Sequence, residues 1–134
     1  MTPTPIDELT TLPIDLEQGN KGLIRTARRT AEFCQVVRDV AAETPGVTLI
    51  DLWSAMSLRA AELTPEWTNK ETGTWLGELA SGTSGGFKQL LSDGIHISGE
   101  GYRLFYSLIE PHILPGIDSN EPPSPLWIRK KEKH

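Results

Sequence analysis

An aspartate and a histidine, Asp93 and His96, stand three residues apart on a segment that has the composition of a turn followed by a helix. A carboxylate at this spacing can contact one imidazole nitrogen, which leaves the other nitrogen free to move protons. Asp93-Gly94 is also a common turn dipeptide, in which the carboxylate bonds only to its own backbone. Spacing alone therefore allows two interpretations, a base with its orienting carboxylate or an ordinary polar turn.

A base of this kind needs a nucleophile, and one serine fits a known pattern. Residues 82–86, Gly-Thr-Ser-Gly-Gly, satisfy Gly-x-Ser-x-Gly, and the order Ser84, Asp93, His96 is that of the α/β-hydrolases. The nucleophile elbow, however, needs a buried strand before the serine and a helix after it. The sequence around Ser84 is instead a Gly/Ser-rich flexible segment, so we expect Ser84 to be a loop residue.

The remaining candidates for chemistry have simpler structural interpretations. His112 falls in the last turn of an expected helix, where the helix dipole favours an imidazolium, and His134 is terminal. Asp93, His96 and His112 follow no established spacing of zinc ligands, so we expect no metal site and no cofactor. Cys34 is the single cysteine, which excludes an intrachain disulfide, and it lies in an apolar helical stripe where we expect a buried structural thiol.

Length, composition and charge limit the classes of protein to consider. The chain has 134 residues, of which 37% are hydrophobic, enough for one domain with a core of its own. Acidic residues outnumber basic ones by 18 to 13, and the basic residues cluster only at positions 129–133, which argues against a nucleic-acid partner. No apolar run is long enough to span a bilayer, and the N-terminus lacks the order of a signal peptide, so we expect a cytoplasmic protein.

Hydrophobic spacing predicts a helix, a strand and a second helix in the first half of the chain. Residues 1–22 are rich in proline and show no periodicity, so they are predicted to form a loop. From Leu23 to the stop signal at residues 44–46, small and apolar residues recur at helical spacing: Ile24, Ala27, Ala31, Cys34, Val37 and Ala41. Residues 47–50 have the composition of a buried parallel strand, and residues 52–63 are helix-like again. This α-β-α order is typical of open α/β sheets.

The second half is predicted to hold a long loop, one more helix and a tail. Residues 64–91 show no regular pattern. Ser98 has the position of an N-cap, and an apolar stripe follows it up to the prolines at 111 and 115: Tyr102, Phe105, Leu108, Ile109 and Ile113. Residues 117–134 are expected to be disordered or loosely attached. A single strand is too few for a sheet, so the sequence looks like the end of a larger domain.

Three segments together resemble one enzyme family. Residues 93–102, Asp-Gly-Ile-His-Ile-Ser-Gly-Glu-Gly-Tyr, resemble the last conserved block of the GDSL or SGNH hydrolases, where an Asp-x-x-His turn opens the C-terminal helix. Residues 2–7, Thr-Pro-Thr-Pro-Ile-Asp, are similar to the proline-rich loop after the fourth strand of isoamyl acetate-hydrolysing esterases. Residues 47–53, which end in Ile-Asp-Leu-Trp, resemble their fifth strand and the residues directly after it. The segments are in the right order and cover most of the chain to about residue 113.

The resemblance implies an activity and a fold. His96 would be the general base and Asp93 its orienting carboxylate in a serine esterase that acts on small carboxylic esters without a cofactor. Residues 1–116 would form the C-terminal portion of a three-layer, flavodoxin-like α/β domain, mostly helical with one buried strand. The family's Gly-Asp-Ser nucleophile block and its oxyanion-hole Gly and Asn have no counterpart in the sequence. Trp53, Trp67 and Trp75 could line an acyl or alcohol pocket, with core packing as the alternative for Trp53.

Three functions are therefore open at this stage. The first is an esterase chain that retains only the His/Asp part of the triad and is inactive unless another polypeptide complements it. The second is a non-catalytic truncated product, or a remnant kept for protein interaction or self-association through its exposed apolar helix faces. The third is a small helical binding domain whose likeness to the esterases is accidental.

Overall fold

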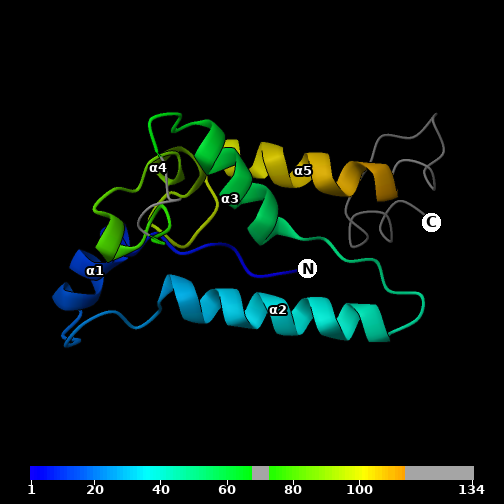
Figure 1. The fold of residues 1–134 in the computed structure, drawn as a ribbon, viewed down its shortest axis with the longest axis horizontal. Helices are drawn as coiled ribbons and strands as arrows, with labels where there is room; N and C mark the ends of the chain where they lie inside the picture. The colour runs from blue at the N-terminus through cyan, green and yellow to red at the C-terminus, as the bar shows by residue number, and fades with distance from the viewer. Residues whose placement is uncertain (68–72, 114–134) are drawn as a thin grey trace, which may run out of the picture.

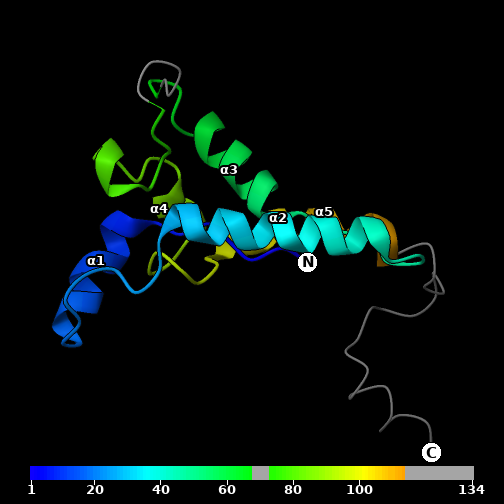
Figure 2. The ribbon, with the colours of Figure 1, turned by 60° about the horizontal axis from the view of Figure 1, so that its bottom comes forward.

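α-Helices dominate the computed structural model, which describes residues 1–67 and 73–113. Within these ranges the helices are α1 (Glu8–Glu17), α2 (Ala27–Glu43), α3 (Leu52–Glu62), α4 (Phe87–Leu90) and α5 (Gly99–Ile113), with one 3₁₀ turn, η1 (Leu79–Ser81). Figures 1 and 2 both place α1 at one end of the molecule and the C-terminal end of α5 at the other. The predicted mostly helical character is confirmed.

The N-terminal segment runs between α2 and α3 (Figure 1) and contacts both helices. The Thr2 hydroxyl accepts a hydrogen bond at 2.9 Å from the amide of Trp53, in the first turn of α3. On the other side, the Sγ of Cys34 in α2 lies 3.8 Å from the carbonyl oxygen of Pro3. These contacts join α2 and α3 through the N-terminal segment, in addition to the direct hydrogen bond from Arg38 of α2 to the Ser54 hydroxyl of α3 at 3.0 Å.

Helix α2 ends where the sequence signals predict, but it begins at Ala27, later than the start expected at Leu23. The Thr26 hydroxyl caps its N-terminus by accepting a hydrogen bond from the Arg29 amide at 3.2 Å. At the other end Pro45 cannot continue the helix, and Gly46 adopts a φ of +79° that most residues avoid. The predicted burial of Cys34 is also confirmed, because its side chain is fully covered, and this burial raises the pKa of the thiol.

Helix α3 supplies the centre of the main core. The Asp51 carboxylate caps it by accepting from the Ser54 amide at 3.2 Å. Leu52, Met56 and Ala60 follow at four-residue spacing, and none of them is exposed to solvent. They pack with buried residues of the following segment, Leu76, Phe87, Leu90 and Leu91, and with the partly buried Leu104, Phe105 and Leu108 of α5. The predicted helix over residues 52–63 is therefore confirmed.

Helix α5 starts at the predicted cap. The Ser98 hydroxyl accepts a hydrogen bond from the amide of Gly101 at 3.2 Å. Gly101 lets the helix approach the preceding segment, because a Cβ at this position would collide with the Leu90 carbonyl oxygen. Pro111 lies inside the last turn and does not end the helix.

The buried strand predicted for residues 47–50 is wrong. These residues have no regular secondary structure, and the Val47 side chain is 53% exposed. One backbone hydrogen bond reaches the segment from the N-terminal residues, from the Thr2 amide to the Ile50 carbonyl oxygen at 3.0 Å. A strand needs a ladder of such bonds, and one extended neighbour with a single bond does not provide it. The apolar, β-branched composition indicates a propensity for strand, but it does not show whether a neighbouring strand is present to pair with residues 47–50.

The loop predicted for residues 1–22 is also wrong, because α1 occupies its middle. Two buried carboxylates of α1 itself bind it to other segments of the chain. Glu8 accepts hydrogen bonds from the amides of Ala27 at 2.7 Å and Leu79 at 2.9 Å. Asp15 accepts from the amide of Ile24 at 3.1 Å. The sequence of α1 is short, contains Pro13 and shows no helical periodicity. The helix is instead stabilised by hydrogen bonds to distant residues, which periodicity does not reveal.

The long segment 64–91 is irregular as predicted, apart from η1 and α4 in its described part. The expected tail, residues 117–134, and His134 lie outside the described residues. None of the described helices is both long enough and apolar enough to cross a membrane.

Candidate functional site

Asp93 and His96 contact each other directly. The Asp93 Oδ2 lies 2.6 Å from the Nδ1 of His96. The other carboxylate oxygen, Oδ1, accepts hydrogen bonds from the backbone amides of Ile95 at 3.0 Å and His96 at 2.8 Å. These backbone and side-chain bonds from His96, assisted by the Ile95 amide, lower the pKa of Asp93 to about 2. Asp93 is therefore an ionised, oriented carboxylate at neutral pH.

The turn that carries the pair is closed by its own backbone. Leu91 and Ile97 form an isolated antiparallel bridge. Inside it, the Ser92 amide donates to the His96 carbonyl oxygen at 2.8 Å, and outside it the Ser98 amide donates to the Leu90 carbonyl oxygen at 2.9 Å. Both residues of the pair thus lie within one short closed turn, so their contact depends on local geometry.

The N-terminal segment fixes the same turn from the opposite side. The Asp7 amide donates a hydrogen bond to the Gly94 carbonyl oxygen at 2.9 Å. The Thr4 hydroxyl donates to the Ile95 carbonyl oxygen at 3.1 Å. Two residues of the N-terminal segment therefore bind the carbonyl groups of Gly94 and Ile95, the two residues between Asp93 and His96.

The arrangement leaves one imidazole nitrogen available for chemistry. If Nδ1 carries its proton toward Asp93, then Nε2 has the free lone pair and can accept a proton from another group. The His96 side chain is 76% exposed, so an external group can reach it. Within residues 1–67 and 73–113, the hydrogen bonds of His96 are made with Asp93 and Ser92 alone.

Ser84 is not aligned with this pair. Its hydroxyl is buried and donates a hydrogen bond to Asp7 Oδ1 at 2.9 Å. The other Asp7 carboxylate oxygen accepts from the Thr10 hydroxyl at 2.8 Å. Neither Ser84 nor the residues directly before it, 73–83, form a strand, so Ser84 does not stand at a nucleophile elbow. Its predicted assignment as a loop residue is confirmed.

Asp7 is a structural residue that the sequence analysis missed. It joins Ser84, Thr10 and Gly94, and it stands directly before α1. An aspartate before a helix is a common start signal, and this signal could have revealed both Asp7 and the helix.

The other predicted chemical residues stand apart from the pair. His112 is exposed in the last turn of α5. In the described ranges, no three His, Cys, Asp or Glu side chains lie close enough together to hold a metal ion.

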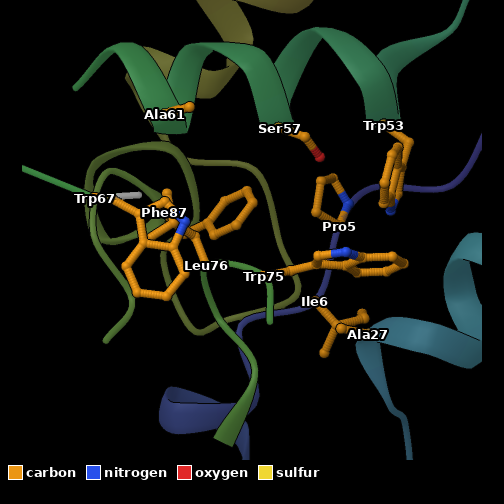
Figure 3. Close-up of a pocket in the computed structure, with 10 residues that line it drawn as sticks. All are labelled: Pro5, Ile6, Ala27, Trp53, Ser57, Ala61, Trp67, Trp75, Leu76 and Phe87. Carbon is orange, nitrogen blue, oxygen red and sulfur yellow. The ribbon is translucent and has the colours of Figure 1, made fainter. Parts of the chain in front are cut away.

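The three tryptophans of the predicted pocket do come together. Trp53, Trp67 and Trp75 line a cavity of about 300 Å³ (Figure 3). The rings of Trp53 and Trp75 meet edge to face, with centroids 5.8 Å apart. Neither Asp93 nor His96 lines this cavity.

Comparisons of the chain with protein-family models, with curated proteins and with solved structures give no match.

Proposed function

We propose that this chain is part of a carboxylic ester hydrolase of the GDSL or SGNH type, similar to the isoamyl acetate-hydrolysing esterases. His96 acts as the general base and Asp93 as its orienting carboxylate. The observation that carries the proposal is the 2.6 Å contact between Asp93 Oδ2 and His96 Nδ1. The backbone bonds to Asp93 Oδ1 add to it, since they hold the carboxylate ready for an imidazolium.

The contacts between the three resembling segments support the same proposal. Thr2 bonds to Ile50 and Trp53, which joins the proline-rich segment to the segment likened to the fifth strand. Thr4 bonds to the carbonyl oxygen of Ile95, which joins it to the Asp-x-x-His turn. In an α/β hydrolase domain of this type, these segments would meet at the carboxyl edge of a sheet, where ligands bind.

The proposed chemistry is acyl transfer through a serine. The serine oxygen attacks the ester carbonyl carbon while His96 Nε2 takes the serine proton, and the imidazolium then gives that proton to the departing alcohol. Water repeats the sequence on the acyl-enzyme and releases the acid. Ser84 is buried and bonded to Asp7, so it is not the nucleophile of this proposal. The proposal assigns that role to a serine of a second polypeptide, in the Gly-Asp-Ser block of the family.

Complementation tests the proposal directly. The full chain is mixed with a second polypeptide that carries the Gly-Asp-Ser, Gly and Asn blocks of an isoamyl acetate-hydrolysing esterase, and hydrolysis of p-nitrophenyl acetate is followed. We expect turnover only in the mixture and its loss in His96→Gln. His112→Gln is the matched control, because exposed imidazoles hydrolyse this ester slowly without a partner.

Two results would contradict the proposal. Either the mixture shows no turnover, or mixtures with His96→Gln and with the unmodified chain turn over equally fast. Both results would show that His96 is not the general base. Fast turnover by the chain alone that disappears in Ser84→Ala would instead show that Ser84 is the nucleophile.

A second candidate function, association without catalysis, is favoured by one feature of α2. Phe33, Val36 and Val40 form an apolar stripe along this helix, and each is 57–58% exposed. Contiguous exposed apolar residues of this kind mark association surfaces. Sedimentation of the chain at several concentrations measures self-association, and Val36→Asp is expected to abolish any dimer formed through the stripe. A dimer with the same stability in Val36→Asp would show that the stripe is not involved.

A further inference from the structure

A cavity of about 350 Å³, here called the arginine groove, lies between the N-terminal segment, the start of α2 and the Asp93–His96 turn. Its apolar lining consists of Pro3, Ile6, Ile24, Phe33 and Ile95, and its polar lining of Thr4, Arg25, Thr26, Arg29 and Thr30. Among the described residues, no aspartate or glutamate lines it. Ile24 and Phe33 are more than half exposed, so a molecule in solution can reach the groove.

The two arginines of the groove differ from the other arginines of residues 1–67 and 73–113. The others each form an ion pair with a carboxylate, at 2.9–3.3 Å: Arg28 with Glu78, Arg38 with Asp51, Arg59 with Glu62 and Arg103 with Glu100. In the same ranges, Arg25 and Arg29 form no ion pair. The groove therefore carries two uncompensated positive charges, although the chain has a net charge of -5.

Neither arginine stabilises α2 through its charge. Arg25 precedes the Thr26 cap, and Arg29 lies in the first turn of the helix. The helix dipole favours acidic side chains at this end and is opposed by basic ones, and the first turn of α2 contains no acidic residue. Both arginines are exposed, so neither fills the core. An anion bound between them would supply the charge that this end of α2 lacks.

We propose that the arginine groove binds a small phosphate monoester with a compact apolar body. The phosphate of a monoester carries about -1.5 to -2 charges at pH 7, which balances the two guanidinium groups. The geometry also matches, because two parallel N–H groups of a guanidinium can bond to two phosphate oxygens. The Thr30 hydroxyl makes no hydrogen bond to any other described residue, so it is a further donor.

The apolar lining explains why the ligand is an organic phosphate and not the free ion. Phe33, Ile24 and Pro3 offer the body of the ligand a surface that it can cover, and covering it removes apolar area from water. The volume of about 350 Å³ is near the lower end of the range of roughly 300–1,000 Å³ for ligand sites, which favours a compact molecule. The proposal does not depend on the role of His96.

Three probes separate the charge of the ligand from its apolar body. Phenyl phosphate, inorganic phosphate and phenol are titrated into the full chain at neutral pH. Binding is followed at the backbone amides of Thr30 and Ile95 and at the Nε–H signals of Arg25 and Arg29 in a two-dimensional ¹H–¹⁵N spectrum. We expect saturable shifts with phenyl phosphate. Inorganic phosphate should bind about 3–10-fold more weakly because it lacks the ring, and phenol at least about tenfold more weakly because it lacks the charge.

Variants locate the binding. Arg25→Gln and Arg29→Gln should each weaken phenyl phosphate about fivefold or more, because each removes a charged donor. Lys88→Gln removes the same charge at an exposed residue of α4 outside the groove, and it should change the affinity by less than about twofold. Phe33→Ala should weaken phenyl phosphate but leave inorganic phosphate unchanged.

Circular dichroism checks the fold of each variant, and Arg29→Lys, which keeps the charge but not the planar fork, replaces Arg29→Gln if that protein does not fold. The proposal is overturned by the absence of saturable binding, by equal affinity for phenol, or by equal weakening in Lys88→Gln and Arg29→Gln. It is also overturned if phenyl phosphate and inorganic phosphate bind equally well, since the groove would then attract free anions only.

Discussion

Gly94 packs against the backbone of Asp7 so closely that a Cβ at position 94 would stand 2.8 Å from the Asp7 carbonyl oxygen. The Asp7 amide bonds to the Gly94 carbonyl oxygen at 2.9 Å, so the two backbones touch at two points. Gly94 also has a φ of +88°, in the region that favours glycine. The Asp93–His96 turn can therefore lie this close to Asp7, at the start of α1, only because residue 94 has no side chain.

Gly94→Ala is predicted to lower the free energy of unfolding by about 1–3 kcal/mol or more, since a strained φ and a steric collision are combined. Urea denaturation of the chain measures the change. Gly99→Ala is the control, because a Cβ there meets nothing within 4 Å at the first turn of α5. Equal stability of the two variants would mean that the turn is not held against Asp7.

Ser84→Ala is predicted to destabilise the chain by about 1–3 kcal/mol, because the buried Asp7 carboxylate loses a hydrogen-bond donor. Ser107→Ala provides the comparison, since the Ser107 hydroxyl is exposed and bonds to the Leu104 carbonyl oxygen within α5. We expect its effect to stay within about 0.5 kcal/mol. Thermal unfolding of both variants distinguishes a structural serine from a dispensable loop residue.

Glu8→Ala is predicted to loosen two distant parts of the chain at once. The Glu8 carboxylate accepts from the amides that begin α2 and η1, at Ala27 and Leu79. Hydrogen exchange should accelerate at both amides in the variant, with a loss of stability of about 1–3 kcal/mol. Glu17→Ala, at the exposed end of α1, should leave both exchange rates unchanged. Acceleration at neither amide would show that Glu8 does not join these segments.

The features that could be predicted from the sequence are those that neighbouring residues determine. The Asp93–His96 contact lies within one turn, and α2, α3 and α5 carry local caps in Thr26, Asp51 and Ser98. Each of these signals is complete within a few residues of sequence.

The features that were missed depend on distant partners. Helix α1 is held by hydrogen bonds that Glu8 and Asp15 make with other segments, and the sequence does not reveal those bonds. Residues 47–50 have strand propensity, but strand formation is decided by a neighbouring ladder, and Thr2 supplies one bond only. The gathering of Trp53, Trp67 and Trp75 also depends on distant packing, of α3 against a long irregular segment, but it was expected from the family resemblance.

The pKa of Asp93 provides the sharpest test of the proposed base-and-orienter pair. Backbone and side-chain hydrogen bonds from His96 hold it at about 2, below the ordinary 3.8. Because the folded pKa is the lower one, the ionised Asp93 stabilises the turn above about pH 4, and this stabilisation is lost as the pH falls toward 2. A carboxyl ¹³C titration of the full chain by NMR should follow this transition at Asp93.

The same titration in His96→Ala separates the backbone from the side chain. Loss of the imidazole removes the bond at 2.6 Å but keeps the amide bonds from positions 95 and 96. We therefore expect the pKa of Asp93 to rise in His96→Ala and to remain below 3.8, since the amide of residue 96 has the largest effect. A value near 3.8 in the unmodified chain would show that the carboxylate is not held by the turn, and it could not then orient His96.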